Sequence, residues 1–205
     1  DRAVIARRPL DDVETQHLAA ASVALRSGKL VVAPTDTLPG LLARYFDTEA
    51  VKASYRVKQR PFTEPVPVLV SGVQQADQLV ELDVSSRRLI ERHWPGALTV
   101  VARRRDGTDP VHGRATLGVR CPEPGWLRLL IDDVGPVTGS SANLHGIETL
   151  NSAQDAAAEL SASVYYVIPG LSPGGTASTV VDVTGDTPVV LRAGPIEEIE
   201  LKLDT

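Results

Sequence analysis

The sequence predicts a single α/β domain, and three observations support this prediction. Short apolar runs, rich in valine and leucine, alternate with segments of helical periodicity along the chain. No internal repeat, low-complexity tract or interdomain linker divides the 205 residues, so we expect one domain, residues 1–205. The hydrophobic content of 42% is typical of a globular protein, and a chain of this length buries roughly 70% of its unfolded surface.

The first elements are expected to bring a polar turn to the edge of a sheet. A helix should begin at Asp11 and Asp12 and run to about Arg26, where Ser27-Gly28 ends it as a C-cap. A short apolar strand at residues 29–33 is followed at once by the turn Pro34-Thr35-Asp36-Thr37, and an apolar segment resumes at Gly40. A polar turn that follows a strand commonly carries functional side chains.

Helices and strands continue to alternate through the rest of the chain. We expect further helices at residues 47–57, 74–82, 84–93, 122–133 and 152–160. We expect further strands at residues 66–70, 97–102, 116–120, 136–138, 164–168, 178–183 and 189–192. The strands at 97–102 and 116–120 should form a hairpin with a long polar loop. The glycine-rich loop at 170–176 is a candidate lid.

The turn Lys58-Gln59-Arg60-Pro61 places two cations just beyond the helix expected at residues 47–57. Pro61 biases Arg60 away from helical backbone angles. A lysine point charge beside an arginine fork suits a polyanion such as the phosphates of a nucleotide. Cations at a helix C-terminus also complement the helix dipole, and for these four residues alone that second interpretation is favoured, because such cations are common.

Four polar clusters stand at the ends of expected strands and helices. They are Thr35/Asp36/Thr37, Lys58/Arg60, Ser140/Ser141/Asn143, and Ser178/Thr179 with Arg192. In open α/β sheets ligands bind where strands end, so these hydroxyls, amide and cations are candidate ligand contacts. Each cluster taken alone is better explained as turn chemistry, because Ser, Thr, Asn and Asp side chains bond to nearby backbone.

Composition disfavours several other functions. The net charge of −5 argues against a general attraction to nucleic acid or membranes, and the basic run Arg103-Arg104-Arg105 is better explained as a solvated hairpin end.

The sequence also lacks the usual signs of a resident metal site. Cys121 is the single cysteine, and the four histidines lack zinc-site spacing. No Walker loop occurs. No 18-residue apolar run and no signal peptide are present, which predicts a cytoplasmic protein without a membrane partner. The chain contains no methionine, so we expect its native start to be missing.

Taken together, the motifs resemble those of one family. In chain order they are Pro34-Thr35-Asp36-Thr37, Lys58-Gln59-Arg60-Pro61, Trp94-Pro95-Gly96, Val119-Arg120, Ser141-Ala142-Asn143-Leu144, Ser178-Thr179-Val180-Val181-Asp182 and Leu191-Arg192. Over about residues 13–196 the chain resembles the YrdC-like threonylcarbamoyl-AMP synthases of the short, single-domain type. The combination of Lys-x-Arg with Ser-x-Asn is specific, whereas any single piece is not.

The resemblance implies both a fold and a reaction. The fold would be a twisted, mixed α/β sheet with flanking helices and a concave nucleotide-binding cleft. The reaction would condense L-threonine, bicarbonate and ATP, with Mg²⁺, to threonylcarbamoyl-AMP and pyrophosphate, which is the activity of a nucleotidyltransferase. A tRNA-modifying complex would then transfer the threonylcarbamoyl group to an adenosine of tRNA, with at most a weak tRNA contact by this chain.

The resemblance also implies the roles of individual residues. Lys58 and Arg60 would act in catalysis and bind the ATP phosphates. The other implied ATP-binding residues are Glu64, Thr116, Ser141, Asn143, Thr149 and Arg192. The implied threonine-binding residues are Thr35, Arg120, Gly139 and Ser178. An arginine fork suits the threonine carboxylate, and preorganised cations suit the charge that builds on the phosphates.

Two positions depart from the family pattern. Pro39 stands where the family usually has an aromatic residue, and Glu64 stands where it has an asparagine. These departures leave open a paralogue of the same fold that carbamoylates another substrate. A second alternative is a non-catalytic RNA-binding module, although the net charge argues against it.

Overall fold

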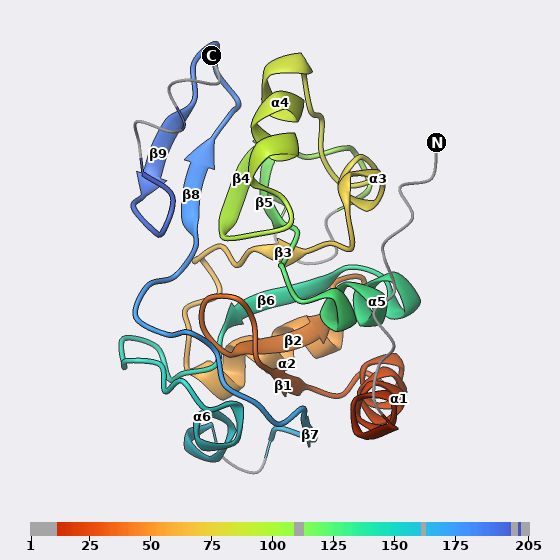
Figure 1. Ribbon diagram of the computed structural model, residues 1–205. Coiled ribbons are helices and arrows are strands. Elements are labelled where there is room, and N and C mark those ends of the chain that lie inside the picture. Colours follow the sequence, from red (N-terminus) through yellow and green to blue (C-terminus); the bar gives the residue numbers. More distant parts are fainter. Residues whose placement is uncertain (1–11, 109–112, 161–162, 198–200, 202–205) are drawn as a thin grey trace.

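A computed structural model describes residues 12–108, 113–160, 163–197 and 201. The described strands form one mixed sheet in the order β7-β1-β2-β6-β3-β5-β4-β8-β9 (Figure 1). The strands are β1 (Val31–Ala33), β2 (Gly40–Arg44), β3 (Val68–Leu69), β4 (Leu98–Arg103), β5 (Thr116–Arg120), β6 (Val137–Ser141), β7 (Tyr166–Val167), β8 (Thr179–Asp182) and β9 (Val189–Arg192). The helices are α1 (Asp12–Arg26), α2 (Thr48–Lys58), α3 (Val73–Ala76), α4 (Val84–His93), α5 (Gly125–Val134) and α6 (Ala153–Glu159). The predicted α/β class and mixed sheet are confirmed.

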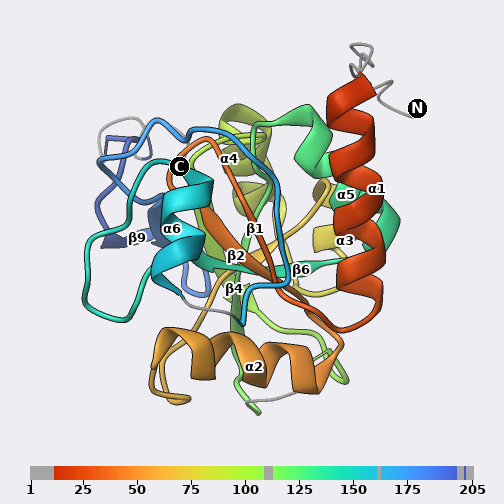
Figure 2. The same cartoon turned by 90° about the horizontal axis from the view of Figure 1, so that it is seen from below.

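The half of the sheet formed by β7, β1, β2 and β6 is packed with helices on both faces. Helices α1 and α5 cover one face, and α2 and α6 cover the other (Figures 1 and 2). In β1, Val31 and Ala33 face the first pair of helices, while Val32 faces the second. A strand buried on both faces is apolar at every position, which explains the uninterrupted apolar runs of β1 and β2.

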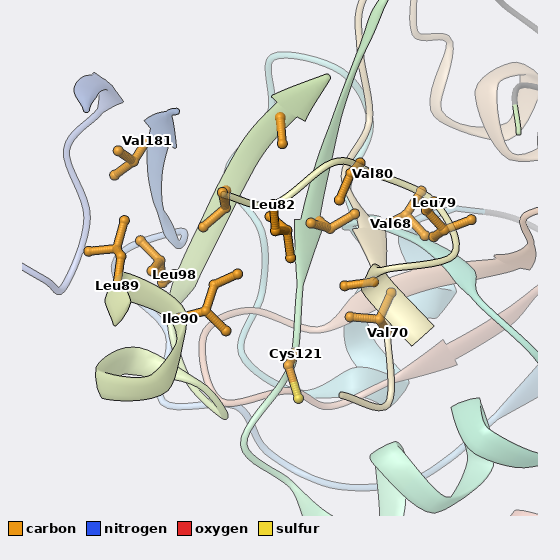
Figure 3. Packing of buried hydrophobic residues seen from close by; sticks show 14 of the residues in the cluster. Val68, Val70, Leu79, Val80, Leu82, Leu89, Ile90, Leu98, Cys121 and Val181 are labelled. Atoms are coloured by element: carbon orange, nitrogen blue, oxygen red, sulfur yellow. The ribbon is translucent and has the colours of Figure 1, made fainter. Parts of the chain in front are cut away.

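The other half, formed by β3, β5, β4, β8 and β9, is packed against helix α4 on one face. Leu89 and Ile90 of α4 lie in one core with Leu98 and Val181 of the sheet (Figure 3). Because side chains alternate along a strand, the neighbours of these core residues point to the opposite face. Val180 is such a neighbour, and it lines a cavity on that face.

The predicted helix at 74–82 is wrong in length, since α3 ends at Ala76. The chain beyond it leaves the helix to pair with the sheet. Val80 forms a β-bridge with Arg104, and the Glu81 N–H donates to Arg103 O at 2.8 Å. These sheet hydrogen bonds replace those that a longer helix would make.

Several predicted strands also differ in length. The strand expected at 164–168 contains only Tyr166–Val167. The strand expected at 66–70 contains only Val68–Leu69, because Pro65 and Pro67 have no N–H to donate to a ladder. The strand expected at 136–138 continues as β6 to Ser141, where it pairs with Gly40. Ser140 and Ser141 therefore project from a strand and not from the loop that follows it.

Other expectations hold. β4 and β5 form the predicted antiparallel hairpin, Asp47 caps α2, and Ser152 caps α6. Asp11 and residues 109–112 of the hairpin loop lie outside the described residues. Within the described chain, no helix has the length and apolar character needed to cross a membrane.

Candidate active site

A cavity of about 430 Å³ opens on the face of the sheet opposite α4. Such a volume suits a ligand of nucleotide size. Its wall includes apolar side chains of the sheet, such as Val101, Leu117 and Val180. It also carries four arginines, which are Arg60, Arg104, Arg114 and Arg192. An apolar surface with several cations suits a flat ring system attached to an anionic group. We call this space the large cavity.

A second, smaller cavity of about 120 Å³ adjoins the first. Its lining includes four residues for which the resemblance implies threonine binding, namely Thr35, Arg120, Gly139 and Ser178. These residues come from four segments far apart in the sequence, and the fold brings them together. Hydroxyl groups and one guanidinium in a small space suit a small polar molecule that carries a carboxylate. We call this space the small cavity.

The two cavities meet at shared residues. Arg60, Pro65, Pro67 and Arg192 line both of them. Arg60 and Arg192 bring two cations to this junction, and burial, with the charges of Arg120 and Arg60, lowers the pKa of Arg192. An anion bound at the junction would relieve this repulsion.

The end of α2 directs the two cations of the Lys-x-Arg motif to different places. Gln59 adopts the left-handed conformation (φ 53°) and ends the helix, with its N–H donating to Tyr55 O and Arg56 O. Lys58, the last helical residue, is only 1% exposed. Arg60, one residue past the reversal, reaches the junction of the cavities.

Lys58 lies at the centre of a hydrogen-bonded network. Its ammonium donates to Ser141 O, to Asn143 O at 2.8 Å and to Asn143 Oδ1 at 3.3 Å. Asn143 Oδ1 also accepts from Ser141 Oγ at 2.5 Å and from Thr149 Oγ1 at 3.0 Å. Burial, with a smaller effect of Arg60, lowers the pKa of Lys58 from 10.5 to about 8. Four residues with implied ATP-binding roles are thus connected, but of these only Ser141 lines either of the two cavities described above.

Arg60 is held by the loop that follows it. Its Nη2 donates to Pro65 O at 2.9 Å and lies 3.2 Å from Glu64 Oε2. Glu64 also lies 3.4 Å from His145 Nε2. Glu64 therefore contacts Arg60 and does not line either cavity. Arg60 Nε is buried and has no hydrogen-bond partner among the described residues, which leaves a donor for a bound ligand.

Arg120 is oriented by three groups of the protein. Its Nη2 forms an ion pair of 2.6 Å with Asp36 Oδ1, and both side chains are only 7% exposed. Its Nη1 donates to Thr37 Oγ1 at 2.9 Å, and its Nε donates to Gly96 O at 3.0 Å. A guanidinium has five N–H donors, so one hydrogen on each Nη atom remains, and a carboxylate accepts such a pair.

Ser178, which directly precedes β8, contacts Arg192, the last residue of β9. Arg192 donates from Nη2 to Ser178 O at 2.8 Å and to Ser178 Oγ at 3.1 Å. Ser178 Oγ also lies 2.8 Å from Thr99 Oγ1. Because Ser178 lines the small cavity and Arg192 lines both, this contact links the two spaces. Thr116 lines the large cavity beside Arg114.

Sequence reasoning assigned no specific role to several residues of these cavities. Thr37 lines the small cavity and belongs to a predicted polar cluster, but the resemblance implied a role only for Thr35. Arg104 and Arg114 line the large cavity. Thr99 and Val101 of β4 line the large cavity, so the alternation of side chains along the strand would place Arg103 in the same lining. The structure places Arg104 in the lining instead, one residue past the end of β4, where it forms a β-bridge with Val80.

Pro39 is a residue that sequence reasoning linked to the amino-acid pocket but that does not line the small cavity. The departure from the family pattern at this position suggested a changed amino-acid pocket. Pro39 is buried, its carbonyl accepts from the Ala142 N–H at 2.7 Å, and the neighbouring Leu38 lines the small cavity instead. The side chain that shapes the pocket on this side is therefore Leu38.

The fold and the two joined cavities define an α/β protein in which a cavity with several cations adjoins a small polar one. Comparison with protein families makes the assignment specific. The family model Sua5/YciO/YrdC, described as telomere recombination, matches residues 23–194. The chain therefore belongs to the Sua5/YciO/YrdC family.

Individual relatives agree with this assignment. A protein of Mycobacterium leprae is 37% identical over 191 residues, which cover 90% of this chain and 86% of the relative. The threonylcarbamoyl-AMP synthase of Bacillus subtilis is 34% identical over 93% of this chain and 58% of its own length. The crystal structure of Pyrococcus abyssi Sua5 complexed with L-threonine superposes with a TM-score of 0.87 at 31% identity, over 93% of this chain and 57% of that one. The chain thus spans little more than half of the last two proteins.

Proposed function

We propose that this protein is an L-threonylcarbamoyladenylate synthase, a nucleotidyltransferase that uses L-threonine, bicarbonate and ATP. One observation carries the proposal, namely that a small polar cavity and a large arginine-lined cavity share Arg60 and Arg192. A reaction that joins an amino-acid derivative to a nucleotide needs two such spaces with a common boundary. The names of the relatives support the same activity.

In this proposal the small cavity binds threonine. The two free N–H groups of Arg120 hold its carboxylate, while Thr35 and Ser178 offer hydroxyls to its polar groups. The deprotonated amine attacks the carbon of bicarbonate and water leaves, which gives a carbamate. The new carboxylate points toward the junction, where the α-phosphate of ATP is bound.

The large cavity binds ATP in the same proposal. A carbamate oxygen attacks the α-phosphorus, the bond to the bridging oxygen of the leaving group breaks, and pyrophosphate departs. Arg60 and Arg192 lie where negative charge grows in this step, so they stabilise the transition state by their fixed charges. Mg²⁺ enters with ATP as part of the substrate, with the phosphates among its ligands. No nucleophilic side chain takes part.

The product is a mixed anhydride, which is a reactive acyl donor. We propose that a tRNA-modifying complex receives the threonylcarbamoyl group from it, as the resemblance implies. The contact of this chain with tRNA would be weak, since the net charge is −5.

The decisive experiment is a product assay. Formation of threonylcarbamoyl-AMP and pyrophosphate is measured with each of the three substrates omitted in turn. We expect product only when all three are present, and at least a hundredfold loss in Arg120→Ala and in Arg60→Ala. Surface variant Lys52→Met should keep wild-type activity, because Lys52 pairs with Glu49 on the outside of α2. Product formation without threonine would overturn the proposal.

The same assay addresses the paralogue alternative. Leu38 lines the small cavity and stands beside the position where the family pattern is broken, which is the observation that favours this alternative. Pyrophosphate release is therefore measured with a panel of amino acids. Turnover with threonine alone would remove the alternative, whereas a clear preference for another amino acid would establish it.

A further inference from the structure

The two cations of the Lys-x-Arg motif, Lys58 and Arg60, lie in different environments and make different contacts. Resemblance implies that both hold the ATP phosphates. The left-handed Gln59 reverses the chain between them, so the two side chains diverge. Arg60 lines both cavities, whereas Lys58 is 1% exposed and lines neither.

The donors of Lys58 are all used inside the protein. An ammonium group has three N–H donors. They face three acceptors, namely the carbonyl oxygens of Ser141 and Asn143 and the side-chain oxygen of Asn143. To reach a phosphate, Lys58 would have to give up at least one of these charge-assisted bonds inside the protein.

The acceptors belong to the segment that carries the Ser-x-Asn motif. Ser141 lines the small cavity, and its hydroxyl donates to the same Asn143 oxygen that Lys58 contacts. Lys58 therefore helps to fix the backbone of Ser141 and, through Asn143, the direction of its hydroxyl. Removing the ammonium would remove these contacts, whereas the pairing of Ser141 with Gly40 in the sheet would remain.

We propose that Lys58 is a positioning residue, which acts by holding Ser141 in place and does not itself bind phosphate. The inference rests on the proposed function. It gives the two residues of the motif different tasks. Arg60 contacts the substrate where the cavities meet, and Lys58 holds Ser141, which lines the small cavity. The sequence spacing alone assigns both residues the same task.

A double-mutant cycle tests the proposal. The ratio kcat/KM for ATP is measured in wild type, Lys58→Met, Ser141→Ala and the double variant. If Lys58 acts through Ser141, Lys58→Met should lower kcat/KM by about tenfold or more in the wild-type background, but by less than about threefold in the Ser141→Ala background. An equal loss in both backgrounds would overturn the proposal, since a direct phosphate contact is independent of the serine. Lys52→Met, on the same helix, is the matched control.

A measurement on the wild type covers the case in which Lys58→Met does not fold. Magnesium pyrophosphate is titrated into isotopically labelled protein, and the side-chain nitrogen resonances of Lys58 and Arg60 are followed by NMR. We expect the Arg60 Nε resonance to move by more than that of Lys58 Nζ. A Lys58 shift as large as that of Arg60, or larger, would overturn the proposal. This titration needs no turnover, so its outcome is separate from that of the product assay.

Discussion

At the scale of single residues, the buried ion pair between Asp36 and Arg120 is the contact whose loss should have the greatest effect. Both side chains are 7% exposed, and removal of Asp36 leaves a buried guanidinium without its counter-charge. We expect Asp36→Ala to lower the free energy of unfolding by about 3 kcal/mol and to raise the KM for threonine more than that for ATP. Chemical denaturation and steady-state kinetics measure the two effects.

The control for this variant is Asp133→Ala. Asp133 pairs with Arg26 on the surface, with both side chains about half exposed. An exposed pair contributes less than about 1 kcal/mol. Equal losses of stability in the two variants would contradict a special role for the buried pair.

Lys58 gives a second residue-scale prediction, which concerns pH. Its pKa is about 8 in the folded chain against 10.5 in the unfolded chain. Between these values the unfolded state binds more protons, so the stability of the wild type relative to Lys58→Met should rise by roughly 3 kcal/mol from pH 8 to pH 10.5. Below pH 8 both states are protonated and the difference should be constant. Denaturation of both proteins across this range measures it, and a flat difference would contradict the lowered pKa of Lys58.

At the scale of secondary-structure elements, the close packing of β3 against β6 depends on a glycine. A Cβ atom at Gly139 would lie 2.8 and 2.9 Å from the two Cδ atoms of Leu69. Gly139→Ala should therefore destabilise the protein by about 1–3 kcal/mol and narrow the small cavity, which both residues line. Thermal denaturation and the KM for threonine report these effects.

Two further variants complete the test of this packing. Gly139→Ala combined with Leu69→Ala should recover the threonine KM, because the smaller side chain makes room for the new methyl group. Gly185→Ala should be neutral, because no atom lies within 4 Å of the position its Cβ would take. Failure of the double variant to improve on Gly139→Ala would mean that the clash is not the cause.

The glycine loop at 170–176 is an element whose role stays a prediction. In the structure it rests on the first polar turn, with Ser172 Oγ accepting from the Thr35 N–H at 2.9 Å and the Gly174 N–H donating to Thr37 O at 2.9 Å. These bonds place the loop beside the small cavity. A lid would change its protection from proteolysis when ATP and threonine bind.

At the scale of the whole molecule, the shared boundary of the two cavities predicts that their ligands bind cooperatively. Arg60 and Arg192 belong to both linings, so a ligand in one cavity orders groups that the other ligand uses. Threonine and a non-reactive ATP analogue together should raise Tm by more than the sum of their separate shifts, as differential scanning calorimetry can measure. Arg60→Gln should remove this excess, whereas Thr116→Val, which alters the large cavity alone, should weaken ATP binding and keep the response to threonine. Additive shifts in the wild type would contradict the coupling.

The sequence by itself determined the class of fold and the set of polar clusters. Apolar runs and helical periodicity are local signals, so they predicted α1, α4, the β4–β5 hairpin and the caps at Asp47 and Ser152. The same signals failed beyond Ala76, where pairing of Val80 with Arg104 outweighs local helix preference. The motif order led to the family, which the family comparison confirms.

Only the tertiary structure decided which residues meet and which way they face. The direction of a side chain depends on backbone reversals and packing partners far away in the chain, and spacing carries no record of these. Gln59 reverses the chain between the buried Lys58 and the cavity-lining Arg60, and Arg104 lines the large cavity where alternation would put Arg103. The pairing of Asp36 with Arg120 joins residues 84 positions apart. Two cavities with a common wall exist because the sheet brings such distant segments together.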